Sequence, residues 1–161
     1  TTDAVVGPLG EGLPIIERAV DRAIGALAAE AVGVMDKINA LTLDYSKNRQ
    51  QFGRAIGEFQ VVQHRMTDML METEQARSMA QIAAMTLDRD DDARARELAG
   101  VKARLGKAGR FVGQESIQLH GGMGMTDEMT IGHYFKRLTM IDRTFGDTDH
   151  CMRRYADTLG D

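Results

Sequence analysis

The sequence has one cysteine, two prolines, no tryptophan and 5% aromatic residues. A single cysteine, Cys151, cannot form an internal disulfide, so a reducing compartment, the cytoplasm, is expected. No apolar run approaches the ~20 residues that a bilayer-spanning helix needs, and no basic region followed by an apolar one stands near the N-terminus. The sequence therefore predicts neither a secreted nor a membrane-spanning protein.

The charge balance also excludes a class of partner. Twenty Lys and Arg against twenty-four Asp and Glu give a formal net charge of −4. A general binder of nucleic acid or of anionic membrane would carry an excess of positive charge. With 161 residues, the chain is expected to be one domain or a piece of a larger protein.

The residues that are abundant favour helices. Eleven methionines stand against five phenylalanines and three tyrosines, and both prolines, Pro8 and Pro14, lie near the N-terminus. Methionine and alanine favour helix, whereas strands are rich in β-branched and aromatic residues. Nothing after Pro14 interrupts a helix by lacking a backbone N–H. An all-α chain is predicted from about residue 14 onward.

Apolar residues recur at alternating spacings of three and four, which is typical of one face of a helix. The longest such stripe runs through Ile16, Val20, Ile24, Leu27, Ala31, Val34, Ile38, Leu41 and Tyr45. Further stripes cover residues 62–87, 98–119 and 131–138, and a short helix is expected at residues 149–159. The prediction is an antiparallel up-down four-helix bundle with an additional short C-terminal helix.

Helix ends are predicted from acidic and glycine-containing segments. The acidic run of residues 88–92 is expected to cap the helix that follows it, because carboxylates accept from free N–H groups at a helix start. The glycines of residues 121–124 are expected to end the third long helix. Residues 126–128, Thr-Asp-Glu, are expected to cap the fourth.

Two segments are not explained by a bundle. RQQFG, residues 49–53, places an arginine, two amides and a phenylalanine beside a glycine; QLHGGMG, residues 118–124, places an amide before a glycine-rich helix end. Arginine and amide groups suit phosphates or a polar heteroaromatic ring, and glycines let the backbone approach a flat ligand closely.

Both segments resemble the C-terminal helical domain of the acyl-CoA dehydrogenase family, and the resemblance covers nearly the whole chain. It includes YSKNRQQFGRAIGEFQ and QESIQLHGGMGMTDE. Family enzymes are flavoproteins with an N-terminal helical domain, a middle β-domain and this bundle. The resemblance implies that residues 1–13 are the exit from a β-domain and that residues 14–161 are the bundle.

The resemblance also implies a cofactor, a substrate and partners. The cofactor is FAD, the substrate is an acyl-CoA thioester, and electrons leave to an electron-transfer acceptor. The subunits are homologous and form a dimer of dimers, either homomeric or heterotetrameric, without nucleic acid, a metal ion or a membrane span. The positions that match FAD contacts of the family are Arg49, Gln51, Phe52, Ile56, Phe59, Gln60, Gln118, Gly121 and Gly122.

The positions that match the catalytic base of the family carry no carboxylate. Family chemistry removes an α-proton as hydride leaves the β-carbon, which requires a base. The usual position of that base is Phe145 here, and a rarer one on the first long helix is Ala23. Asp147 and Asp149 are candidate substitutes.

Three alternatives therefore stand: a subunit or fragment that lacks its own base, an active dehydrogenase with a displaced Asp base, and a purely structural oligomerisation domain without cofactor. The first alternative is favoured, and it implies that the domain alone is inactive. His64 and His133 have no ligand pattern around them, and the adjacent His150 and Cys151 diverge on a helix, so neither a metal site nor a nucleophilic site is expected.

Overall fold

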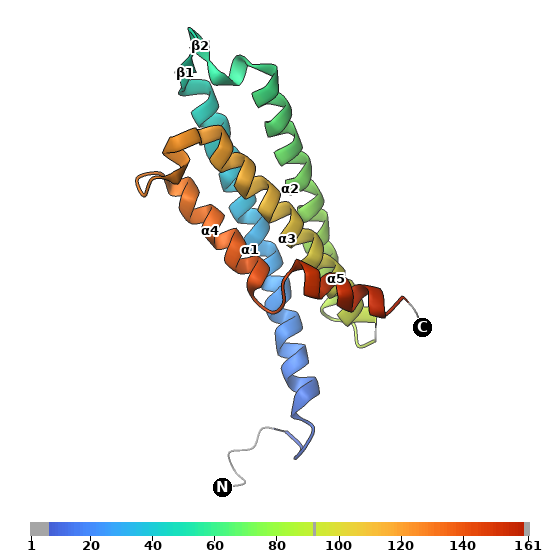
Figure 1. Cartoon of the computed structure of the whole chain (residues 1–161). Coiled ribbons are helices and arrows are strands. Elements are labelled where there is room, and N and C mark those ends of the chain that lie inside the picture. The colour runs from blue at the N-terminus through green and yellow to red at the C-terminus, as the bar shows by residue number, and fades with distance from the viewer. Residues whose placement is uncertain (1–6, 92, 160–161) are drawn as a thin grey trace.

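The computed structural model describes residues 7–91 and 93–159. Within them the chain forms five α-helices, which alternate in direction along the first four (Figure 1). Their bounds are α1 Gly12–Asn48, α2 Gln60–Thr86, α3 Ala93–His120, α4 Thr130–Arg143 and α5 Thr148–Asp157. The predicted all-α up-down four-helix bundle with a short C-terminal helix is confirmed.

Helix α3 is the centre of the bundle, in contact with α1, α2, α4 and α5. Its stripe from Leu98 to Val112 is buried as predicted, and small residues on another face are buried as well. A Cβ at Gly113 would lie 2.6 Å from a ring carbon of Phe135, so this glycine lets α4 pack close. A Cβ at Gly109 would make ordinary van der Waals contact with Leu138, 3.4 Å away.

The stripe predicted for α1 is correct in the middle of the helix and wrong at its start. Ile24 and Ile38 are buried, but Ile16 is 61% exposed. The first turns of α1 extend beyond the other described helices, so none of those helices packs on them (Figure 1). Further along α1, the buried face includes apolar residues such as Met35 and polar residues such as Thr42.

The segment between α1 and α2 is not helical. It forms a small antiparallel hairpin, β1 Gln50–Gln51 with β2 Arg54–Ala55, followed by a 3-10 turn η2 at Ile56–Glu58. The two linking residues, Phe52 and Gly53, have φ of 54° and 78°. Consecutive left-handed residues are what a tight hairpin turn requires. The sequence patterns did not predict this short hairpin within the all-α fold.

The cap predicted at residues 126–128 is wrong. A 3-10 turn, η3 Gly121–Met125, follows α3, and α4 begins at Thr130 after Met129, which provides no side-chain cap. The Thr126 hydroxyl instead donates to the Met123 carbonyl, 2.9 Å away, and closes η3. The acidic cap expected for α3 falls on Asp92, which lies outside the described residues.

Candidate functional site

The two segments that the bundle pattern does not explain lie at the same end of the molecule. The hairpin follows α1 and η3 follows α3, and the up-down topology brings both ends together (Figure 1). Tyr45 in the last turns of α1 stacks on His120 at the end of α3, with ring centroids 4.3 Å apart. The Tyr45 hydroxyl also donates to the His120 carbonyl, 3.3 Å away. The two segments are therefore parts of one surface.

Aromatic side chains and an arginine gather on the hairpin. Phe52 is 92% exposed and meets the ring of Phe59 edge-on, with centroids 6.2 Å apart. The guanidinium of Arg54 lies over the Phe59 ring, 4.0 Å from its centroid. A non-glycine residue held at positive φ with its ring in solvent is costly, and such strain is typical of ligand sites.

The polar residues predicted in this segment point outward from a fixed backbone. The Arg49 carbonyl accepts from the Ile56 N–H, 2.9 Å away, while the Arg49 side chain is exposed and forms no ion pair within the described part of the chain. Gln51 and Gln60 are exposed too, whereas Ile56 is half-buried under the hairpin. A free guanidinium at a fixed position is available for an anionic ligand.

The glycine-rich end of α3 leaves backbone open to solvent. Gln118, Gly121 and Gly122 are all exposed, and Gly121 has a φ of 61°. A Cβ built at Gly122 has no atom of the described chain within 4 Å. The space beside this backbone can therefore take a ligand that a side chain would exclude.

His120 beneath this surface is a structural histidine. It is 3% exposed, and its Nδ1 lies 2.8 Å from the Ser116 carbonyl. Burial lowers the pKa of His120 below its usual value, and the Ser116 carbonyl opposes that shift. The ring is therefore neutral and packs between the two segments.

The position expected for the family base lies at the opposite end of the bundle, in the loop between α4 and α5 (Figure 1). Phe145 is 47% exposed with a φ of 60°, and Gly146 follows with a φ of 99°. Ala23 is half-buried on α1. Neither side chain has an atom that can accept a proton.

The two candidate substitutes are less suited to be bases than their carboxylates suggest. Asp147 is the N-cap of α5, since it accepts from the His150 N–H at 2.9 Å, and it also pairs with Arg143 at 3.1 Å. The hydrogen bond from His150 is the main cause that lowers the pKa of Asp147, which weakens it as a base. Asp149 lies exposed in the first turn of α5.

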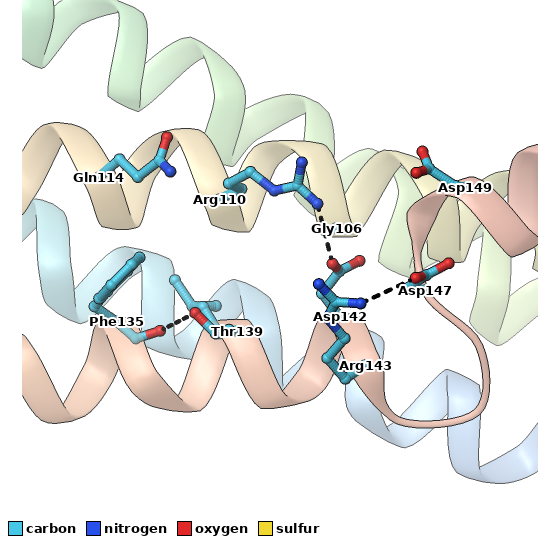
Figure 2. A pocket seen from close by; sticks show the side chains of 10 residues that line it. Gly106, Arg110, Gln114, Phe135, Thr139, Asp142, Arg143, Asp147 and Asp149 are labelled. Carbon is cyan, nitrogen blue, oxygen red and sulfur yellow. Dashed lines mark hydrogen bonds and ion pairs between the residues drawn. The ribbon is translucent and has the colours of Figure 1, made fainter.

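Both aspartates line a pocket of about 320 Å³ between α3, α4 and α5 (Figure 2). Arg110 from α3 reaches Asp142 in this pocket, and Arg143 reaches Asp147. Phe145 is not among the residues that line it. Asp147 and Asp149 therefore line this pocket, whereas Phe145, at the position expected for the family base, does not.

Lys102 is a functional candidate that the sequence analysis missed. It is 1% exposed, and its ammonium donates to the carbonyls of Asp142 at 2.8 Å and Gly146 at 2.9 Å. Its signal in the sequence is a charge within the short apolar run of residues 98–103, LAGVKA, in which no other residue is charged. Such a lysine is rarely fully buried without a specific partner.

In the described part of the chain, no group of three or more metal-ligating side chains gathers at one place. His64 and His133 are exposed on α2 and α4, and His150 is exposed while Cys151 is buried. None of the described helices is long and apolar enough to cross a membrane.

Comparison with known proteins assigns the chain to a family. The family model described as acyl-CoA dehydrogenase, C-terminal domain, matches residues 10–159. The chain is 36% identical over 134 residues to acyl-CoA dehydrogenase IpdE2 of Mycolicibacterium smegmatis, covering 83% of this chain and 41% of that protein. It thus spans about two fifths of the length of such relatives.

Solved structures agree. The structure described as PigA with FAD and proline superposes with a TM-score of 0.87 and 32% identity, covering 96% of this chain and 40% of that one. A variant of the Tcur3481–Tcur3483 steroid ACAD superposes with a TM-score of 0.83 and 30% identity, covering 88% and 39%. The chain belongs to the acyl-CoA dehydrogenase family, of which it is a C-terminal helical domain.

Proposed function

We propose that this chain supplies one side of an FAD site at a subunit interface of an acyl-CoA dehydrogenase-like flavoprotein and does not itself supply the catalytic base. The substrate class is an acyl-CoA thioester that is dehydrogenated between its α and β carbons. The electrons pass on to an electron-transfer acceptor. Bound FAD accepts the hydride from the β-carbon.

The observation that carries the FAD assignment is the surface made by the hairpin and η3. It combines the free guanidinium of Arg49, the exposed ring of Phe52 and the open backbone at Gly122. These groups suit two parts of a dinucleotide: the central diphosphate pairs with arginine, and the adenine ring packs on an aromatic face or a bare backbone. The donor set fits FAD.

The remaining residues assigned to the cofactor complete this surface. The amides of Gln51, Gln60 and Gln118 can donate to phosphate or ribose oxygens and accept from an adenine amino group. Ile56 and Phe59 are half-buried beneath the hairpin and give it an apolar base. One relative, PigA, is described with FAD bound, which supports the same cofactor here.

The distance between the two ends of the bundle supports a shared site. Lys102, which holds the loop of Phe145, and His120, beneath the glycine-rich turn, are eighteen residues apart on α3. At 1.5 Å per residue this is ~27 Å along the helix. The surface at one end and the loop at the other are thus suited to different cofactor molecules, each completed by another subunit.

The absence of a base supports the partner-subunit hypothesis. Phe145 and Ala23 cannot accept a proton, and Asp147 is occupied as a helix cap. One structural relative carries a name that joins two proteins, Tcur3481 and Tcur3483, which is consistent with an assembly of unlike chains. A homologous partner would then contribute the carboxylate.

An apolar face on α2 supports oligomerisation. Four large apolar side chains on this helix are 39–78% exposed. They are Leu70, Met71, Ile82 and Met85. Water contact with such a face is unfavourable, and subunit association would remove it.

The test is to purify the full-length polypeptide that contains this domain, with and without its homologous partner. The expected product is a yellow oligomer with flavin absorbance that sediments as a tetramer. An oligomer that holds no flavin under either condition would instead support a purely structural domain. Flavin and full activity without any partner would support an active subunit with its own base.

A further inference from the structure

Lys102 is a charged residue at the centre of the bundle. Its side chain is 1% exposed, and both hydrogen bonds that its ammonium donates within the described chain go to main-chain carbonyls, those of Asp142 and Gly146. Asp142 lies in the last turn of α4, and Gly146 lies in the loop that joins α4 to α5. One ammonium therefore bridges a helix end and the loop beyond it.

A buried lysine at this position destabilises the fold unless it forms an interaction that an apolar residue cannot form. Burial lowers the pKa of Lys102, because the interior disfavours the charged form. Methionine or leucine would fill the same space without that desolvation cost. What an apolar side chain cannot replace is the pair of hydrogen bonds, one to the end of α4 and one to the loop.

The loop that Lys102 holds has a conformation that does not persist by itself. Phe145 has a φ of 60° and Gly146 a φ of 99°. A bulky residue in the left-handed region persists only where its surroundings fix it. The Gly146 carbonyl accepts from Lys102 and also from the Cys151 thiol, at 3.8 Å, and burial keeps that thiol protonated by raising its pKa.

The ends of the loop are fixed by bonds of their own. The Asp142 carboxylate accepts from the backbone N–H of Thr148 at 3.1 Å and from its hydroxyl at 2.7 Å. Thr144 donates to the Met140 carbonyl at 2.7 Å. Asp147 is bonded to Arg143 and to the His150 N–H. Within the described chain, the hydrogen bonds to the two left-handed residues themselves are those that the Gly146 carbonyl accepts.

We infer that Lys102 is a positioning residue, which fixes the loop of residues 144–147 and thereby sets where the Phe145 side chain stands in the acyl or flavin site. The loop-fixing part rests on the contacts above, and the effect on the site rests on the proposed function. Lys102 acts from behind the loop and touches neither substrate nor cofactor.

The experiment uses the full-length, FAD-loaded assembly and compares Lys102→Met with a control, Lys107→Met, five residues along α3 and exposed. Amide hydrogen exchange is followed by mass spectrometry. Loss of the two bonds should speed exchange of the peptide over residues 143–148 by ~10-fold or more, while peptides of α1 and α2 stay unchanged. The control, Lys107→Met, should change the exchange rate neither of that peptide nor of the peptides of α1 and α2.

A second variant separates positioning from mere packing. Lys102→Gln keeps an N–H donor on a slightly shorter side chain, so it should restore part of the loop's protection; it also serves if the methionine variant does not fold. Uniform acceleration over the whole bundle, or an unchanged loop in both variants, would overturn the inference.

The flavin spectrum and the KM for an acyl-CoA are measured in the same variants. Faster loop exchange with a shifted spectrum or a raised KM supports both the positioning role and the proposed site. Faster loop exchange with the spectrum and KM unchanged keeps Lys102 as the residue that fixes the loop, but it contradicts the placement of Phe145 at the acyl or flavin site.

Discussion

Tyr45 stacks on His120 with ring planes 26° apart, and this contact joins the end of α1 to the end of α3. The up-down order of the helices places the hairpin and the glycine-rich turn at the same end of the bundle, and this contact links them directly. With it, an exposed arginine, an exposed aromatic ring and an open stretch of backbone form one surface. The candidate cofactor site therefore depends on a contact between half-buried Tyr45 and buried His120.

The buried ring makes stability depend on pH. Burial lowers the pKa of folded His120, whereas in the unfolded chain it is ~6.5, so unfolding takes up a proton between these two values. The free energy of unfolding should therefore fall as pH drops from about 6.5 towards the folded pKa, by at most ~1.4 kcal/mol per pH unit. Below the folded pKa this contribution levels off.

Urea unfolding at fixed protein concentration, from pH 5 to pH 8, measures this dependence. His120→Gln should flatten it, whereas His64→Gln, at an exposed position on α2, should leave it in place. An equal slope in the wild type and in His120→Gln would show that another group is responsible.

Gly122→Ala separates cofactor binding from folding. A Cβ at this position meets no atom of the described chain, so the stability of the protein should change by less than ~0.5 kcal/mol. If FAD packs against this backbone, the added methyl group should weaken flavin binding in the intact assembly. The readouts are the midpoint of urea unfolding and the flavin dissociation constant.

Gly33→Ala is the matched control, since Gly33 is exposed on α1 and also has open space around it. It should leave flavin binding unchanged and stabilise its helix slightly. Equal flavin affinity in the Gly122 and Gly33 variants would remove Gly122 from the cofactor site.

Arg49→Ala should weaken FAD retention in the assembly. A charge-assisted hydrogen bond from arginine contributes ~1.5–3 kcal/mol, which corresponds to a loss of about ten- to a hundredfold in affinity. Arg49→Lys should lose less, because it keeps the charge without the planar fork. Flavin titration of the apo assembly measures both.

Arg153→Ala, an exposed arginine on α5, serves as the control for Arg49→Ala. Its flavin affinity should match that of the wild type. If Arg49→Ala matched it too, the family correspondence would fail at the RQQFG segment.

The helices were predictable because most of their burial follows a helical period. Leu98, Leu105 and Val112 recur at intervals of seven and lie in the core. The exposed start of α1 was not predictable, since Ile16 continues an apolar period that no neighbouring helix covers. Periodicity reports which face is apolar and not whether a partner lies against it.

The hairpin was hidden for a different reason. Each of its strands has two residues, too short for alternation, and its turn places Phe52 where Asn or Asp usually precedes glycine. The loop at the position expected for the family base has the same Phe-Gly pair, Phe145 with Gly146, again with both residues at positive φ. Residue propensities do not predict a phenylalanine at positive φ, although the Phe-Gly pair itself can be read in the sequence.

The candidate cofactor residues were identified through resemblance and not through pattern. The sequence alone singled out RQQFG and QLHGGMG, but nothing in it shows that residues 49–53 and 118–124 share a surface. That follows from the up-down order of the helices and from the contact between Tyr45 and His120. Lys102 was missed because its partners are backbone carbonyls that no residue type indicates.

The central claim is that this chain helps to hold FAD but does not abstract the substrate proton. The most direct test is the exchange of substrate α-protons with D₂O in the FAD-loaded assembly that carries Asp147→Asn and Asp149→Asn together. Asparagine caps a helix about as well as aspartate, so α5 should remain intact while both candidate bases are removed. We expect an unchanged exchange rate. Because removal of a general base costs ~10²–10⁴ in rate, a fall of ~100-fold or more with FAD retained would contradict the account.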